Sequence, residues 1–260
     1  MMNAKKKTVL VTGGNRGIGQ QVCRELASEG WDVLLAARDP KKGEHAASRL
    51  RKETGGRVKS VELDVTSEES IATAARKLKD GAIRIDAIVN NAGVYGEGRG
   101  AEGVRRTLQT NFFGPLRVVD GLLPLLNDGA RIVNVTSGLG ALSGLSRERA
   151  AALSDPKLTR ERLVAMMTEC ERDAARGWGN DVYGISKAAL NALTAVLARE
   201  LGARGMKVSS TCPGWVRTDM GGRGAPRSVE EGAASVLYGV RLPDSTPSGR
   251  IWRDGAEIAP

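Results

Sequence analysis

The chain has 260 residues, of which 41% are hydrophobic and 27% charged, a composition that suits a soluble α/β protein and argues against disorder. Its formal charge of +9 comes from basic residues that are dispersed, apart from Lys5-Lys6-Lys7. Because only 3% of residues are aromatic and no zinc-finger spacing occurs, we expect no nucleic-acid partner and assign the charge to a solvated surface and a phosphate-bearing cofactor.

Metal, disulfide and membrane-spanning features are also not expected. Cys23, Cys170 and Cys212 lie far apart and form no CxxC pair, which argues against a disulfide framework and against zinc. The single histidine, His45, lies in a charged helical stretch and should be solvated. The apolar run at 8–12 is too short for a signal peptide and no stretch is long enough to span a membrane, so we expect a cytoplasmic protein without a membrane partner.

Strand-like and helix-like segments alternate along the chain. Short apolar runs predict strands at 9–11, 33–37, 58–63, 85–89, 131–135 and 207–211, with a final edge strand at 250–252. Apolar residues at helical spacing predict helices at 17–29, 41–53, 67–79, 104–126 (kinked at Pro115), 181–201 and 228–239. The alternation predicts one domain over 1–260, a doubly wound parallel sheet of Rossmann type with helices on both faces.

One segment interrupts this alternation. Between Ser137 and Tyr183 a helical pattern occupies 158–175, and no strand is evident. We therefore predict a helical insertion over 138–182.

A glycine-rich turn, Thr12-Gly13-Gly14-Asn15-Arg16-Gly17-Ile18-Gly19, joins the first expected strand to the first expected helix. Glycines there let the backbone approach a pyrophosphate, and the helix N-terminus supplies N–H groups and partial positive charge. The spacing G-x-x-x-G-x-G is weak alone and also suits an ordinary tight turn. Its place after a strand favours a dinucleotide site, with the following contacts: Gly13, Asn15, Arg16, Gly17, Ile18 and Gly19.

Two arginines favour NADP(H) as the dinucleotide. Arg38 follows the second expected strand, where an acid binds an adenosine 2′-hydroxyl and an arginine accommodates a 2′-phosphate. Arg16 approaches from the glycine turn, and two guanidinium groups can fork onto one phosphate. Asp39 favours the opposite interpretation, because it could accept the hydroxyl of NAD(H), and either arginine could be an ordinary surface charge.

Further motifs occur in a fixed order. They are Asp64 after the third strand, the stretch Asn90-Asn91-Ala92-Gly93, the set Asn111, Ser137, Tyr183 and Lys187, and the stretch Pro213-Gly214-Trp215-Val216-Arg217-Thr218. Together with the glycine turn, they resemble the short-chain dehydrogenase/reductase family from about residue 7 to about residue 255. The resemblance implies a catalytic role for the set of four. It also implies cofactor contacts at Asp64, Val65, Asn90, Ala92, Gly93, Tyr183, Lys187, Pro213, Gly214, Val216 and Thr218.

A subgroup of that family, the monomeric NADPH-dependent carbonyl reductases, is similar in more detail. The similarity covers 11–19, 37–39 and 213–220, and the subgroup also has a long insertion before its catalytic tyrosine. In that subgroup the insertion covers the helices through which other members form tetramers. The resemblance therefore implies a monomer that uses NADP(H), with no metal, and it leaves the substrate open because the insertion could not be aligned.

Tyr183 and Lys187 are the expected acid–base pair. They are four residues apart on an expected helix, so both side chains share one face. A free tyrosine has a pKa of about 10, and a neighbouring ammonium group favours the phenolate, which suits a general acid for ketone reduction. A Tyr-x-x-x-Lys pair alone is common by chance. The resemblance also implies that Lys187 holds the nicotinamide ribose.

Ser137 and Asn111 are expected to complete the catalytic set. Ser137 ends the fifth strand, where its hydroxyl can donate to the substrate oxygen, although Thr136 is adjacent and a serine there also suits a turn. Asn111 lies in the long expected helix, where a bend could free a carbonyl for a water that relays protons from Lys187. A surface asparagine on that helix is the alternative.

Two further positions have open interpretations. Residues 90–93 suit a cofactor contact but also an ordinary loop, and Trp215 suits either the substrate pocket or the core.

The residues and the resemblance together predict an NADPH-dependent reductase of aldehydes, ketones or quinones. Two alternatives stay open: an NADP-dependent alcohol dehydrogenase acting on a sterol, polyol or terpenoid, and a non-catalytic dinucleotide-binding sensor.

Overall fold

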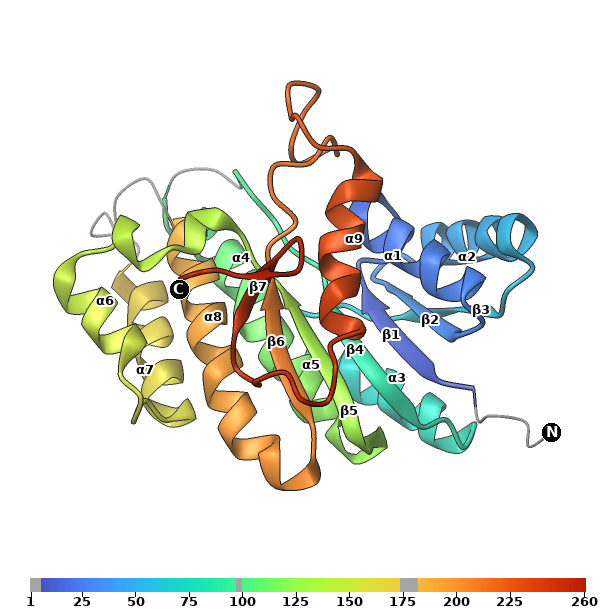
Figure 1. The fold of residues 1–260 in the computed structure, drawn as a ribbon, viewed down its shortest axis with the longest axis horizontal. Coiled ribbons are helices and arrows are strands. Elements are labelled where there is room, and N and C mark those ends of the chain that lie inside the picture. The colour runs from blue at the N-terminus through green and yellow to red at the C-terminus, as the bar shows by residue number, and fades with distance from the viewer. Residues whose placement is uncertain (1–5, 97–99, 174–181) are drawn as a thin grey trace.

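An eight-stranded sheet runs through the protein in the order β3-β2-β1-β4-β5-β6-β7-β8 (Figure 1). The computed structural model describes residues 6–96, 100–173 and 182–260. The strands are β1 (Thr8–Thr12), β2 (Asp32–Ala37), β3 (Val58–Glu62), β4 (Ile85–Asn90), β5 (Leu126–Val135), β6 (Lys207–Thr211), β7 (Ile251–Arg253) and β8 (Ala256–Glu257). All neighbouring strands pair in parallel except β7 and β8, which are antiparallel.

Helices cover both faces of this sheet. On one face lie α1 (Gly17–Ser28), α2 (Pro40–Thr54) and α9 (Val229–Val240). On the other lie α3 (Glu68–Asp80), α4 (Ala101–Asn111), α5 (Phe113–Leu122) and α8 (Val182–Leu201). Successive side chains along a strand point to opposite faces of the sheet and so belong to two different cores. Val9 and Val11 face one core and Leu10 faces the other. The prediction of a doubly wound, mostly parallel sheet is confirmed.

The prediction of one long helix over 104–126 is wrong, because the structure has two helices there. The first ends at Asn111 and the second begins at Phe113, with Phe112 at φ −115° and ψ −60° between them. Pro115 has no N–H to donate to the carbonyl of Asn111, four residues earlier, so the hydrogen-bond ladder is interrupted. The second helix ends at Leu122, and β5 begins at Leu126 rather than at residue 131.

The final strand was also predicted incompletely. Residues 251–253 form β7, but the edge of the sheet is β8, which pairs with β7 through Trp252 and Arg253. A two-residue strand carries too little pattern to be recognised from a sequence.

The predicted helical insertion is present in the described residues. It contains α6 (Arg147–Ser154) and α7 (Arg160–Arg172), which begin at the side-chain caps Ser146 and Thr159. Both helices pack against α8, and α7 also contacts α4, so they lie outside the helical layer (Figure 1). Residues 174–181 of the insertion fall outside the described residues, and so does the expected start of α8 near 181.

A row of buried polar side chains joins the centre of the sheet to α8. Asn90 Nδ2 donates to Asn134 Oδ1 (2.9 Å), and Asn134 Nδ2 donates to Thr194 Oγ1 on α8 (2.8 Å). Thr194 Oγ1 lies 2.8 Å from Ser210 Oγ of β6 and donates to the Leu190 carbonyl. All four side chains in the row are buried, so the row fixes the position of α8 on β4, β5 and β6.

None of the helices in the ranges described above is long and apolar enough to cross a membrane. His45 is exposed, as expected, and the three cysteines are free and buried.

Asn134→Ala should lower the free energy of unfolding by about 2–4 kcal/mol, because it leaves the buried Asn90 Nδ2 without its partner and removes one of the hydrogen bonds of Thr194 Oγ1. Urea unfolding of the purified protein measures this change. The exposed Lys59→Ala on β3 is the control and should change stability by less than about 0.5 kcal/mol. A loss below about 1 kcal/mol for Asn134→Ala would show that the row does not hold α8 in place.

Candidate active site

The expected site residues gather where neighbouring parallel strands end. Parallel strands place their carboxyl ends at one edge of the sheet, where ligands bind in doubly wound folds. The glycine turn follows β1, residues 91–94 follow β4, Ser137 follows β5, and the 212–227 segment follows β6 and projects beyond the sheet in Figure 1. Tyr183 and Lys187 are on the first two turns of α8.

The glycine turn is packed tightly against the segment after β4. A Cβ on Gly19 would lie 2.3 Å from Asn91 Nδ2, and one on Gly13 would lie 3.1 Å from Ala92 Cα. Gly13 and Gly17 also have positive φ values, 63° and 54°, which favour glycine. The turn therefore requires glycine both for its conformation and for this close approach.

Thr12 and Asn91 hold the turn in place, and neither was among the predicted site residues. Thr12 Oγ1 accepts the N–H groups of Asn91 and Ala92, both at 3.0 Å. Asn91 Nδ2 donates to the carbonyl of Thr12 at 2.9 Å. Both residues belong to motifs noted in the sequence, the glycine turn and the stretch 90–93. Membership of these motifs, rather than residue type, could have indicated their structural role.

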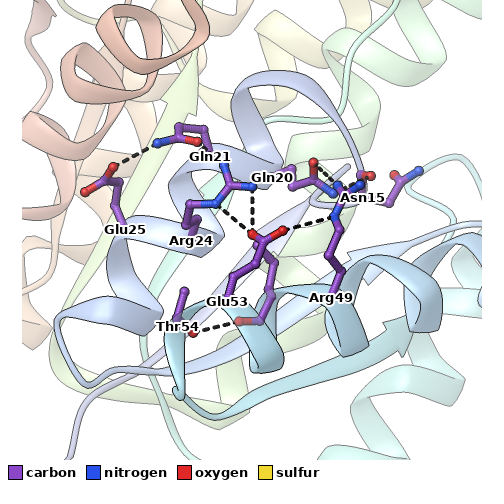
Figure 2. A network of polar contacts seen from close by, with 9 residues as sticks. Asn15, Gln20, Gln21, Arg24, Glu25, Arg49, Glu53 and Thr54 are labelled. Atoms are coloured by element: carbon purple, nitrogen blue, oxygen red, sulfur yellow. Dashed lines mark hydrogen bonds and ion pairs between the residues drawn. The ribbon is translucent and has the colours of Figure 1, made fainter.

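Polar contacts from α2 support the turn from outside (Figure 2). Gln20 Nε2 donates to the carbonyl of Asn15 (3.0 Å), and Arg49 donates to Gln20 Oε1 (2.6 Å). Arg24 donates through Nε and Nη2 to Glu53 on α2 (3.1 and 2.9 Å). These contacts tie the start of α1 to α2.

The N-terminus of α1 is left open for an anion. Its N-cap residue, Arg16, makes no side-chain capping bond, and the first turn contains no acidic residue. By contrast, side chains cap α2 (Asp39), α3 (Ser67) and α9 (Ser228). Uncapped N–H groups beside close-packed glycines fit the pyrophosphate of a nicotinamide dinucleotide.

Arg38 and Asp39 have different surroundings at the end of β2. Asp39 Oδ1 accepts the N–H of Lys42 (3.0 Å) and so caps α2. This backbone hydrogen bond holds the pKa of Asp39 below its usual value. Arg38 is exposed and has no hydrogen bond or ion pair within the described part of the chain. The guanidinium is thus available to a ligand, while the carboxylate is engaged by its own helix.

Arg16 lies where expected but has a partner that the sequence did not indicate. Its Nη1 is 2.9 Å from Asp219 Oδ2, and both side chains are exposed. Thr218 lies beside the same turn, since its Cγ2 would be 3.3 Å from a Cβ on Gly17. The segment after β6 therefore meets the glycine turn.

Lys187 is buried beside Tyr183. Its ammonium donates to the carbonyl of Val135 at the end of β5 (2.7 Å), and the side chain is almost inaccessible. Burial lowers the pKa of Lys187 to about 8. The ammonium lies 5.7 Å from the centre of the Tyr183 ring, and the Tyr95 ring meets that ring edge-on at 4.8 Å.

Asn111 is buried, so the interpretation as a surface asparagine is wrong. Its Oδ1 accepts the N–H of Val94 (2.9 Å), and its Nδ2 donates to the Val94 carbonyl (3.0 Å) and to Ser186 Oγ (3.1 Å). Ser186 in turn donates to the carbonyl of Tyr183 (2.7 Å). Asn111 therefore fixes the segment after β4 against the helix that carries Tyr183. Because Pro115 has no N–H, the main-chain carbonyl of Asn111 lacks the donor that it would have in a continuous helix.

Glycines admit these side chains to a narrow space. A Cβ on Gly93 would lie 3.3 Å from Asn111 Oδ1 and 3.7 Å from Lys187 Nζ. A Cβ on Gly140 would lie 2.8 Å from Lys187 Cβ. The segments after β4 and β5 thus enclose Lys187 from two sides.

Ser137 both forms a turn and remains accessible. Its Oγ accepts the N–H of Leu139 (3.2 Å), which leaves the hydroxyl proton available. Ser137 is half-buried, whereas the adjacent Thr136 is buried. Of the two hydroxyls, the geometry favours Ser137 as the one that can reach a ligand.

Trp215 does not belong to the core. It is 60% exposed, and its Nε1 donates to the carbonyl of Gly221 (2.9 Å). Val216 points inward, where a Cβ on Gly232 would meet its side chain at 2.6 Å.

Three predicted cofactor residues have side chains engaged inside the protein. The side chain of Asn90 belongs to the buried polar row, Asp64 Oδ1 accepts the N–H and hydroxyl of Thr66 (2.9 and 2.7 Å), and Val65 is buried against Gly114. For Asn90 and Val65, the backbone atoms remain the groups that could contact a cofactor, whereas Asp64 is half-buried and uses only one carboxylate oxygen in these bonds. Motif matching cannot distinguish a side-chain contact from a backbone contact.

Comparisons with known proteins agree with this geometry. A family model described as "short chain dehydrogenase" matches residues 7–148, and one described as "Enoyl-(Acyl carrier protein) reductase" matches residues 156–236. The chain is 36% identical to carbonyl reductase (NADPH) 1 of Mus musculus, with 97% of this chain and 98% of that protein covered. It is also 36% identical to (+)-neomenthol dehydrogenase of Arabidopsis thaliana, with 96% of each covered. Salutaridine reductase from Papaver somniferum superposes with a TM-score of 0.88 and 31% identity, with 96% of this chain and all of that chain covered.

Lys187→Met should stabilise the cofactor-free protein at pH 7 by up to about 3 kcal/mol. The folded state holds the Lys187 proton less tightly than the unfolded chain does. The penalty is therefore complete below pH 8 and fades between about 8 and the ordinary value of 10.5. Urea unfolding at pH 7 and pH 10 should show the gain shrinking with pH. The exposed Lys59→Met is the control, and its stability relative to the wild type should not change with pH. If the stability difference between Lys187→Met and the wild type is also the same at both pH values, the burial argument is contradicted.

Proposed function

This chain belongs to the short-chain dehydrogenase/reductase family of oxidoreductases, and we propose that it is an NADPH-dependent reductase of aldehydes, ketones or quinones. The observation that carries the proposal is the buried Lys187 ammonium beside the ring of Tyr183, at the strand edge where the glycine turn lies.

Arg38 supports NADP(H) as the cofactor. It offers an unpaired guanidinium at the end of β2, where a 2′-phosphate is bound in such folds. Asp39, the residue that could favour NAD(H), is engaged in capping α2. Relatives named as NADPH-dependent carbonyl reductases support the same choice. The open N-terminus of α1 would hold the pyrophosphate, and the cofactor supplies the hydride when bound.

Tyr183 is the proposed proton donor. Its phenol gives a proton to the substrate oxygen as that oxygen gains negative charge, and the Ser137 hydroxyl donates a hydrogen bond to the same oxygen. The positive charge of Lys187 favours the phenolate that remains. The main-chain carbonyl of Asn111 offers an acceptor for a water that returns a proton by way of Lys187.

Oxidation of an alcohol is the second candidate function. The same residues run the reverse reaction, with Tyr183 as the base, and one relative is named a neomenthol dehydrogenase. The ratio of rates in the two directions with matched ketone and alcohol pairs distinguishes the candidates. A protein that binds NADPH but catalyses neither direction would be the dinucleotide-binding sensor.

The insertion supports a monomer. In the subgroup that this chain resembles, the insertion covers the helices through which other members form tetramers, and here α6 and α7 pack on α8 and α7 also packs on α4. Their buried apolar residues, among them Leu163, Met167 and Cys170, join the core on that face.

Tyr183→Phe should abolish reduction, with a loss of at least about 100-fold in kcat, because it removes the proton donor. The decrease in NADPH absorbance with a panel of quinones, aldehydes and ketones measures this, and NADPH binding should persist. Tyr95→Phe is the matched control, since it keeps an aromatic ring against Tyr183, and it should retain activity. Turnover by Tyr183→Phe equal to that of the wild type would refute the assignment.

Arg38→Asp should reduce kcat/KM for NADPH by about 10- to 100-fold, the worth of a charge-assisted hydrogen bond, and should change that for NADH far less. Lys52→Asp reverses the charge of an exposed residue in the last turn of α2 and so controls for net charge. It should leave the ratio of kcat/KM for NADPH to that for NADH unchanged. If Arg38→Asp leaves that ratio unaltered, Arg38 does not bind the 2′-phosphate.

A further inference from the structure

One guanidinium at the strand edge has no place in the chemistry described so far. Arg253, the last residue of β7, donates from Nη2 to Cys212 Sγ (2.9 Å). A Cβ on Gly138 would lie 2.9 Å from the same Nη2. Because Gly138 directly follows Ser137, the guanidinium lies against the backbone next to the proposed hydrogen-bond donor to the substrate oxygen.

Arg253 has no directly bonded carboxylate within the ranges that the structure describes. It forms no ion pair there, and its buried Nε has no hydrogen-bond partner. The adjacent carboxylate, Asp254, is taken by Arg227 through two hydrogen bonds (2.6 and 2.7 Å). A thiol is a weak acceptor, so the bond to Cys212 does not replace a carboxylate.

Other partly buried arginines of the chain do have carboxylate partners. Arg131 pairs with Asp244, Arg160 pairs with Asp120 and Glu200, and Arg227 pairs with Asp254. Arg253 is half-buried like them. Removing a guanidinium from water without an anion is unfavourable, which indicates that an anionic partner is supplied from outside the chain.

Glycine at position 138 keeps this partner site open. Any larger residue there would meet the guanidinium, and Gly138 itself is exposed. A ligand lying along Ser137 and the exposed Gly138 would therefore pass close to the guanidinium.

Exposed hydrophobic side chains occur at the same strand edge as Arg253. Four large hydrophobic side chains are exposed in the described residues, and all belong to segments at this strand edge: Tyr95, Leu139, Trp215 and Met220. Exposed apolar side chains that gather around one site mark a surface for an apolar ligand.

We propose that Arg253 binds a carboxylate of the substrate, so that the preferred substrates are apolar aldehydes or ketones that also carry a carboxylate. This inference rests on the proposed reductase function. The planar guanidinium suits a carboxylate because it can donate two parallel hydrogen bonds, while the four exposed side chains contact the apolar body of the substrate.

The experiment compares 3- and 4-carboxybenzaldehyde with their methyl esters, in which a methyl group replaces the negative charge of the carboxylate. The wild type should favour at least one acid over its ester in kcat/KM with NADPH. Arg253→Met should reduce that acid-to-ester ratio by at least about 10-fold, mainly through KM. Arg253→Gln, which keeps a polar but shorter and uncharged side chain, should reduce it too and carries the test if the methionine variant does not fold.

Arg250→Met is the matched control. Arg250 lies three residues earlier, is exposed and pairs with Glu257 at 3.5 Å, so its loss should leave the acid-to-ester ratio unchanged. An equal fall in the ratio for Arg250→Met would assign the effect to general surface charge and overturn the proposal.

The outcomes separate the two proposals. If the wild type reduces the esters in a Tyr183-dependent way but prefers them to the acids, or if the Arg253 variants leave the ratio unchanged, the role of Arg253 is overturned and the reductase stands. If the wild type reduces none of these compounds and no other carbonyl compound, the reductase proposal fails, and the substrate inference fails with it.

Discussion

The burial of one ammonium group determines the arrangement of this site. Lys187 is removed from water at the junction of α8 and β5, and its described hydrogen bond is to the carbonyl of Val135. Such a position is unfavourable for a charge, and the lowered pKa reflects this. The protein tolerates this burial because the surrounding elements are held firmly. The buried polar row fixes α8 to the sheet, and Asn111 fixes α8 to α4 through Ser186.

The same side of the molecule combines rigid support with close backbone contacts. Glycines at 93 and 140 leave room for Lys187 between the segments after β4 and β5. Around the glycine turn, the side chains of Thr12 and Asn91 hydrogen-bond to backbone donors and acceptors of the adjoining segments. A nicotinamide dinucleotide would therefore meet a surface that is already formed, which limits the conformational entropy lost on binding.

Much of this could be predicted from the sequence because it follows from local pattern. The alternation of strands and helices indicated the sheet and its two covered faces, and the order of motifs located Ser137, Tyr183 and Lys187. What the sequence could not indicate depends on contacts between distant residues. Nothing near Arg16 points to Asp219, 203 positions away.

The sequence predicted a kink at Pro115 and a possible bend at Asn111, but not that one helix ends at Asn111 and another begins at Phe113. A proline is well tolerated in the first turn of a helix. Pro115 is therefore compatible both with a kink in one helix and with the start of a new helix, and the sequence alone does not distinguish them. The buried side chain of Asn111 likewise shows its role only once Val94 and Ser186 are seen beside it.

The division between interior and surface at this edge bears on how such proteins diverge. Lys187 and Asn111 are buried and are held by contacts with several elements, so changing Asn111 or the buried polar row disturbs folding. Tyr95, Leu139, Trp215 and Met220 are exposed and come from three separate connecting segments, where single replacements commonly alter stability by less than about 0.5 kcal/mol. After gene duplication, one copy can therefore explore new ligands one segment at a time while its catalytic apparatus is inherited intact.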